Sequence, residues 1–86
     1  MIVNWTRHAK QRYAERAARC GLNYGELEQA IKKQEFRIKE LKDKIKTIFK
    51  IQNNFMTAVK TESKEQIYVL TLWESNEEEA ELWKKR

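Results

Sequence analysis

Hydrophobic positions along this chain recur first with a helical period and later with the two-residue period of strands. Thr6 is predicted to cap a first helix that ends near Cys20, where Gly21 fits the left-handed residue just beyond a helix. Residues 23–26 have the pattern of a capping box, and the second helix that they start is predicted to end near Lys33.

Four strands are predicted from residue 36 onward, where apolar and polar residues begin to alternate. The second of these strands has one apolar face and one face that carries lysines. The fourth is apolar on both faces, which is typical of a central strand. The predicted strands cover residues 36–41, 44–51, 55–59 and 67–73.

Turn and cap residues separate these elements. Asn53-Asn54 is predicted to take the positive-φ positions of a tight hairpin turn. Residues 75–78 form a second capping-box pattern, which starts a short helix that Leu82 and Trp83 are expected to dock. The whole pattern predicts a single α+β domain over all 86 residues: two N-terminal helices, a four-stranded antiparallel meander sheet and a short C-terminal helix.

Composition narrows the class of protein. The chain is 41% hydrophobic and 36% charged, which is too apolar for a disordered chain and too charged for a membrane-spanning one. Cys20 is the only cysteine, so an intrachain disulfide is excluded. No stretch has the pattern of a signal peptide or of a membrane-spanning helix, and a cytoplasmic location is therefore expected.

The net charge of +5 is unevenly distributed. Residues 1–50 carry thirteen Lys and Arg against six Asp and Glu, whereas residues 51–86 carry five against seven. A basic half on a small domain favours a phosphate-rich partner such as RNA. The alternative is a solvated surface whose charge serves solubility.

His8, Arg12 and Arg16 are spaced four residues apart on the first predicted helix, so they form one stripe. An imidazole beside two guanidinium groups suits RNA cleavage without a metal. The 2′-hydroxyl loses a proton, the leaving oxygen gains one, and arginine stabilises the charge that develops on the phosphate. These three residues are the predicted catalytic site. The alternative is structural, with the same side chains paired to Glu15 and other carboxylates or packed against the sheet.

Further side chains are predicted to contact nucleic acid. Lysines on the second strand would hold flanking phosphates, and Tyr13, Tyr68 or Trp73 would stack a base. For the lysines the alternative is a solvated sheet face, and the three tryptophans are expected to be core anchors. The predicted nucleic-acid contacts are Arg19, Lys46, Lys50 and Tyr68.

Other chemistries lack their residue patterns in this chain. There is no Gly-rich phosphate loop, no Ser/His/Asp set and no pair of histidines. A single His and a single Cys do not make a structural zinc site. We therefore predict neither a metal nor a cofactor.

His8-Ala9-x-x-Arg12-x-x-x-Arg16, together with a last strand that ends at residues 70–73 in Leu-Thr-Leu-Trp, resembles the signature of a family of small uncharacterised toxin-like domains. That family is similar to the BrnT and RelE-type ribonuclease toxins. The resemblance implies a RelE/barnase-like fold, RNA or the ribosome as the target, and an acidic antitoxin as a protein partner. It also implies that the active site lies on the first helix, although Cys20-Gly21-Leu22 replaces the Arg-Gly-Ile that commonly follows it in the family.

Three hypotheses for function follow from these patterns. The first is a toxin-like, metal-independent endoribonuclease. The second is a non-catalytic nucleic-acid-binding module that uses the same basic stripe. The third is a small interaction protein of viral or mobile-element origin, whose basic surface binds an acidic protein.

Overall fold

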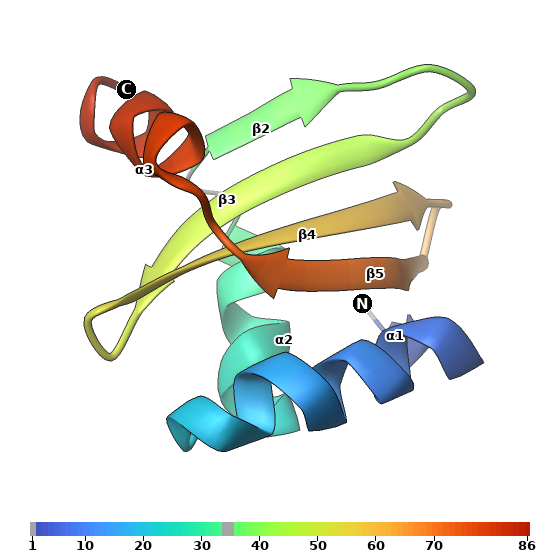
Figure 1. Ribbon diagram of the computed structural model, residues 1–86. Helices are drawn as coiled ribbons and strands as arrows, with labels where there is room; N and C mark the ends of the chain where they lie inside the picture. The colour runs from blue at the N-terminus through green and yellow to red at the C-terminus, as the bar shows by residue number, and fades with distance from the viewer. Residues whose placement is uncertain (1, 34–35) are drawn as a thin grey trace.

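The computed structural model describes residues 2–33 and 36–86, in which a five-stranded sheet carries helices on both faces (Figure 1). The strands lie in the order β1-β5-β4-β3-β2; β1 runs parallel to β5, and all other neighbours are antiparallel. The strands are β1 (Ile2–Trp5), β2 (Phe36–Lys39), β3 (Ile45–Ile51), β4 (Asn54–Glu62) and β5 (Gln66–Glu74). The helical elements are α1 (Arg7–Arg12), η1 (Tyr13–Ala17), η2 (Ala18–Cys20), α2 (Tyr24–Lys33) and α3 (Glu77–Lys84).

The predicted four-stranded antiparallel meander is therefore wrong, because the chain begins with a fifth strand, β1, at one edge of a mixed sheet. Val3 and Trp5 pack against the core from β1, while Ile2 on the same strand is 62% exposed. Four residues are too few to show a clear alternation of apolar and polar positions. The partner strand, β5, lies at the far end of the chain, so no turn signal links the two strands.

The sheet separates two layers of helix. α1 and α2 pack on one face, and α3 packs on the other, as Figure 1 shows with α2 behind the sheet and α3 in front. We call these the core face and the outer face. The core face is the better covered of the two. On β3 the buried Thr47 and Phe49 alternate with residues that face the other way, as the sequence predicts. The main core cluster comprises Ala9, Ala17, Leu22, Leu27, Ile31, Phe49, Met56, Ala58, Ile67, Val69 and Leu72.

β5 lies between β1 and β4, which confirms that it is an interior strand of the sheet. A β-bulge interrupts its pairing with β4: Val59 pairs with Thr71 and Lys60 with Val69, so Leu70 has no partner across the ladder. The Thr6 hydroxyl donates a hydrogen bond to the carbonyl oxygen of Leu70 over 3.2 Å. The bulge thus anchors the residue that caps α1.

The first helix begins as predicted. Its N-cap, Thr6, accepts a hydrogen bond from the amide of Ala9 at 3.1 Å, and Gly21 takes the left-handed conformation with φ 77°. Between these ends the helix is not uniform, since α1 gives way to a π-helical turn (η1) and then to a 3₁₀ turn (η2). The amide of Ala18 bonds to the carbonyl of Tyr13, five residues earlier.

α2 starts at the predicted cap, where Asn23 Oδ1 accepts from the amide of Glu26 at 2.8 Å, and it ends at Lys33 as expected. One turn prediction is displaced by one residue. The positive-φ residues of the β3–β4 hairpin are Gln52 and Asn53, because Ile51 pairs with Asn54 across the turn. In the preceding connection, Leu41 is 86% exposed and lies outside β2, which ends at residue 39.

The cap of α3 is also displaced by one residue. Asn76, rather than Ser75, is the N-cap, and it forms the capping box with Glu79. Trp83 docks the helix through an edge-to-face contact with Phe55, whereas Leu82 is 41% exposed. No helix in the part of the chain that the structure describes is long and apolar enough to cross a membrane.

Candidate nucleic-acid interface

The first helical segment, residues 7–20, is strongly basic. It contains five Lys and Arg and a single carboxylate, Glu15. Ala9 and Ala17 are fully buried on its inner side. These short side chains let the helix lie close to β5, so that the longer basic side chains project from its other sides. The exposed residues of the segment include Arg7, His8, Lys10, Arg16 and Arg19.

The π turn keeps the inward-facing residues Ala9, Tyr13 and Ala17 on the side of the segment that faces the sheet. Residues four apart on a regular α-helix are rotated by about 40° from each other, because one turn takes 3.6 residues. Ala9, Tyr13 and Ala17 would therefore drift off the sheet over two such turns. The wider turn at residues 13–17 reduces the drift, so Ala17 is as deeply buried as Ala9. The same correction acts on Arg12 and Arg16 on the neighbouring stripe.

An aromatic cluster fixes the other side of the segment. The Tyr13 ring stacks on Tyr24 with centroids 3.9 Å apart, and the Tyr13 hydroxyl donates to the carbonyl of Leu22 at 2.9 Å. Trp5 makes edge-to-face contacts with both tyrosines and donates its indole N–H to Glu28 at 2.8 Å. Burial, and secondarily Tyr13, raises the pKa of Tyr24. Tyr13 is thus held within the fold, in a position that does not suit base stacking.

Two of the three predicted catalytic residues are in contact. Arg12 Nε donates to His8 Nε2 over 3.4 Å, and Arg12 Nη1 forms an ion pair with Glu15 at 2.9 Å. His8 is exposed and Arg12 half-buried. The arrangement combines the predicted site with part of its structural alternative, because Arg12 is shared between the imidazole and a carboxylate.

Arg16 and Arg19 differ from Arg12. Both side chains are exposed, and neither forms an ion pair with a carboxylate within residues 2–33 and 36–86. Arg16 follows Arg12 by one turn on the same segment, and Arg19 lies in the terminal turn η2. These two guanidinium groups are therefore available to an anion from solution.

The predicted strand lysines lie on the outer face of the sheet, away from α1. Lys46 is paired with the buried Glu79 at 2.9 Å, and its ammonium lies 5.8 Å from the centre of the Trp73 ring. Glu79 also accepts from the indole N–H of Trp73 at 3.0 Å and from the amide of Asn76 at 2.9 Å. Burial alone would raise the pKa of Glu79, but these bonds and Lys46 outweigh it and lower the pKa. Lys46 thus docks α3.

Lys50 and Tyr68 share that outer face but not that role. Lys50 is exposed and forms no ion pair with a described carboxylate; its ammonium lies 5.7 Å from the centre of the Phe55 ring. Tyr68 is 40% exposed on β5, and its hydroxyl donates a hydrogen bond to Gln66 Oε1 at 2.7 Å. Tyr68 pairs with Asn4 of β1, at the opposite edge of the sheet from β2.

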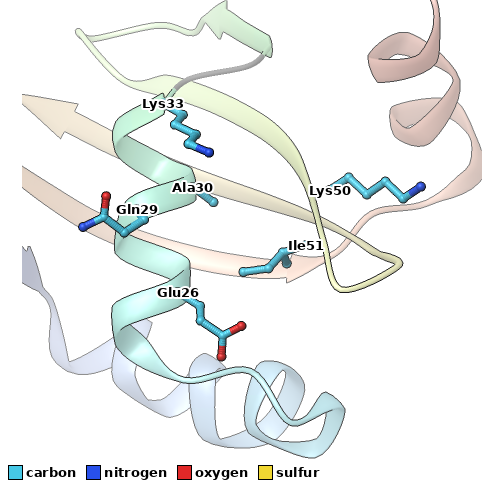
Figure 2. Close-up of a pocket in the computed structure, with 6 residues that line it drawn as sticks. All are labelled: Glu26, Gln29, Ala30, Lys33, Lys50 and Ile51. Carbon is cyan, nitrogen blue, oxygen red and sulfur yellow. The ribbon is translucent and has the colours of Figure 1, made fainter.

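The structure has a groove of about 310 Å³ between α2 and the end of β3 (Figure 2). Figure 2 shows Ile51 pointing toward α2, while Lys50 points away from it. Glu26 lies at one end of this groove, where it accepts a hydrogen bond from Gln52. Its carboxylate offsets part of the positive charge of Lys33 and Lys50, which also line the groove. The residues that line the groove are Glu26, Gln29, Ala30, Lys33, Lys50 and Ile51.

Two more grooves lie on the outer side of the molecule. One, of about 530 Å³, lies between the β2–β3 connection and β5, and another, of about 650 Å³, lies at the start of α3. His8, Arg12 and Arg16 line none of these three grooves. The predicted site is therefore an open helical surface. A long polymer can lie along such a surface, whereas a small substrate would find little enclosure there.

Sequence reasoning missed a buried ionic cluster at the end of α2. Lys60 is fully buried on the core face and donates to the carbonyl of Ile31 at 3.2 Å. Its ammonium also pairs with Glu62 at 2.9 Å, and Arg37 pairs with the same carboxylate at 3.3 Å. Burial lowers the pKa of Lys60 despite this pairing. The available signal was the position of Lys60, which continues the alternating series Met56 and Ala58 on one face of β4.

Comparison with protein-family models, with curated proteins and with solved structures finds no match to this chain.

Proposed function

We propose that this domain binds RNA through the exposed basic side chains of its first helical segment, residues 7–20. The observation that carries the proposal is the pair Arg16 and Arg19, which are exposed and have no carboxylate partner among the described residues. Arg7 and Lys10 on the same segment are also exposed. A surplus of cations along one helix matches the regular spacing of phosphates along a nucleic acid.

The physical basis of the proposal is counterion release. Each phosphate that an arginine neutralises frees a condensed cation, so affinity falls as the salt concentration rises. Guanidinium groups are suited to this role, because their planar donors match two phosphate oxygens at once. A charged surface that serves only solubility would show weak binding with no dependence on any one side chain.

Fluorescence anisotropy with a labelled single-stranded RNA tests the proposal over a range of NaCl concentrations. Replacing both arginines, Arg16→Gln with Arg19→Gln, should weaken binding and make the plot of log affinity against log salt shallower by about 1.4, at roughly 0.7 per lost phosphate contact. The matched control is Lys44→Gln with Lys64→Gln, which removes two exposed cations from loops outside the segment. Equal affinity and equal slope for both double variants would refute the proposal.

RNA cleavage is the second candidate function, and the contact between His8 and Arg12 favours it. In this reaction His8 would take the proton from a 2′-hydroxyl, whose oxygen then attacks the adjacent phosphorus. The resulting imidazolium can return a proton to the departing 5′-oxygen, which leaves a 2′,3′-cyclic phosphate. Arg12 and Arg16 would stabilise the charge on the phosphate oxygens during the transfer.

The cleavage candidate is tested in two separate reactions, one with free RNA in EDTA and one with translating ribosomes in a buffer that contains Mg²⁺. The products of both are examined for cyclic phosphate ends. Cleavage by the native chain should be lost in His8→Ala while RNA binding persists, because the arginines of the segment are unchanged. Intact RNA in both reactions would remove cleavage and leave binding. The proposal places the domain in the cytoplasm, and an acidic antitoxin would compete with RNA for the same basic surface.

A further inference from the structure

A second group of cations lies around two aromatic rings at the junction of the β3–β4 hairpin and α3. The Phe55 ring has two ammonium groups near it, Lys50 at 5.7 Å and Lys84 at 5.5 Å from the ring centre. Phe55 contacts Trp83 edge-to-face with centroids 5.3 Å apart, and the Arg86 guanidinium lies 3.8 Å from the centre of the Trp83 ring. We call these five residues the cation–aromatic cluster.

This cluster is on the same end of the molecule as the last turns of the first helical segment. Cys20 Sγ lies 3.9 Å from a carboxylate oxygen of Glu74, the last residue of β5. The next residue, Ser75, donates its amide to the carbonyl of Phe55 at 2.8 Å. Figure 1 shows the β3–β4 turn, the end of β5 and the end of the first helical segment on one side of the molecule. A chain of contacts therefore joins the two basic regions.

Lys50 and Lys84 of the cluster are not held by strong ion pairs. Lys50 has no carboxylate partner among the described residues. Lys84 approaches Glu81 only to 3.8 Å, and both side chains are more than half exposed, so this pair is weak. Phe55 and Trp83 are themselves only partly buried. The cluster thus offers an aromatic ring and two cations to a partner in solution.

We infer that the cation–aromatic cluster stacks an unpaired nucleobase on Phe55, with Lys50 and Lys84 on the flanking phosphates, so that the nucleic-acid partner is single-stranded. This inference rests on the proposed RNA binding by residues 7–20 and names the form of RNA that is bound. An aromatic ring accepts any base by stacking, and the neighbouring cations hold the backbone. A base within a duplex is stacked on its neighbours and does not offer its face to a protein ring.

The test compares the affinity of Phe55→Leu for three probes: a single-stranded RNA, the duplex of the same sequence, and heparin, a polyanion that has no bases. The variant keeps an apolar side chain against Trp83 but removes the ring. Single-stranded RNA should bind about tenfold more weakly to Phe55→Leu, and heparin should bind unchanged. Phe55→Tyr keeps a ring and should retain the native affinity. Native protein should also prefer the single strand to the duplex.

The other outcomes separate this inference from the function on which it rests. An equal loss of affinity for RNA and heparin would show that Phe55 only positions the cations, and it would overturn the inference. Unchanged RNA affinity in Phe55→Leu, together with weakened binding in the Arg16→Gln, Arg19→Gln variant, would overturn the inference alone. If the native protein binds none of the three probes, both proposals are overturned.

Discussion

Two kinds of basic side chain occur in this domain, and they differ in what lies opposite them. Lys60 and Lys46 extend from the sheet toward carboxylates that are themselves shielded from water. Arg16 and Arg19 extend from a helix into solvent, with no described carboxylate in reach. The first pair supports the fold, and the second is available for binding. Partner geometry, rather than charge alone, separates the two roles.

The comparison also explains why a net charge of +5 says little by itself. A buried lysine such as Lys60 is retained only because a carboxylate and a helix carbonyl satisfy its donors. An exposed arginine needs no such partner, and its removal changes the free energy of unfolding little. Substitutions in the two groups should therefore affect different properties: the free energy of unfolding in the first group and RNA affinity in the second.

The largest expected effect on stability is at Lys60. Lys60→Ala should lower the free energy of unfolding by about 3 kcal/mol, because it leaves a cavity and removes the donor that satisfies the Ile31 carbonyl. Lys60→Met keeps the volume, and Arg37 still pairs with Glu62, so it should cost only about 1 kcal/mol. Urea denaturation measures both variants. Equal costs for both would show that the charge, not the packing, is the main contribution.

Glu79 should make the free energy of unfolding depend on pH in the acidic range. Its pKa is lowered in the folded state, so the unfolded chain binds more protons as the pH falls. Its contribution is complete above the unfolded pKa of about 4.3 and is lost as the pH drops through the lower folded value. Glu79→Gln should flatten that part of the stability profile, measured by thermal unfolding at several pH values. An unchanged acid slope would contradict the assigned role of Glu79.

Lys46 and Lys50 provide a matched pair four residues apart on the same face of β3. Lys46→Gln breaks the ion pair with Glu79 and should lower the free energy of unfolding by about 1 kcal/mol. Lys50→Gln removes the same charge without breaking an ion pair, and should leave stability unchanged while weakening RNA binding. If the two variants were equally destabilised, the distinction between paired and unpaired cations would not hold on this strand.

The smallest effect on stability is expected for Arg16 and Arg19. Replacing both with glutamine should shift the midpoint of thermal unfolding by less than about 3 °C, because both side chains are exposed and lack an ionic partner among the described residues. Differential scanning fluorimetry is sufficient to detect a larger change. A loss comparable to that of Lys60→Ala would mean that these arginines hold the helix in place.

Local signals predicted the parts of this fold that depend on local interactions. The Thr6 cap, the left-handed Gly21 and the apolar face of β3 all follow from neighbouring residues or from a two-residue period. β1 depends on parallel pairing with β5, a strand that lies near the other end of the sequence. No local pattern of residues marks β1 as a strand. The hairpin turn was displaced by one residue, because strand register, not the asparagines, fixes its position.

The site was predictable to the same extent. Spacing alone brought His8 and Arg12 together, since residues four apart on a helix are neighbours. The pairing of Lys46 with Glu79 joins β3 to α3, and the cation–aromatic cluster gathers residues from β3, β4, α3 and the C-terminus. Such groups form only through tertiary packing. The sequence therefore showed where basic residues are abundant, but not which of them are already paired.

An NMR titration of the ¹⁵N-labelled domain with a short single-stranded RNA tests most directly whether the exposed arginines form the binding surface. The account predicts that amide shifts change most at residues 16–20, with a second group at residues 50–55 and 83–84. Dominant changes at residues 40–44 and 63–65, in the β2–β3 and β4–β5 connections, with none at residues 16–20, would contradict it.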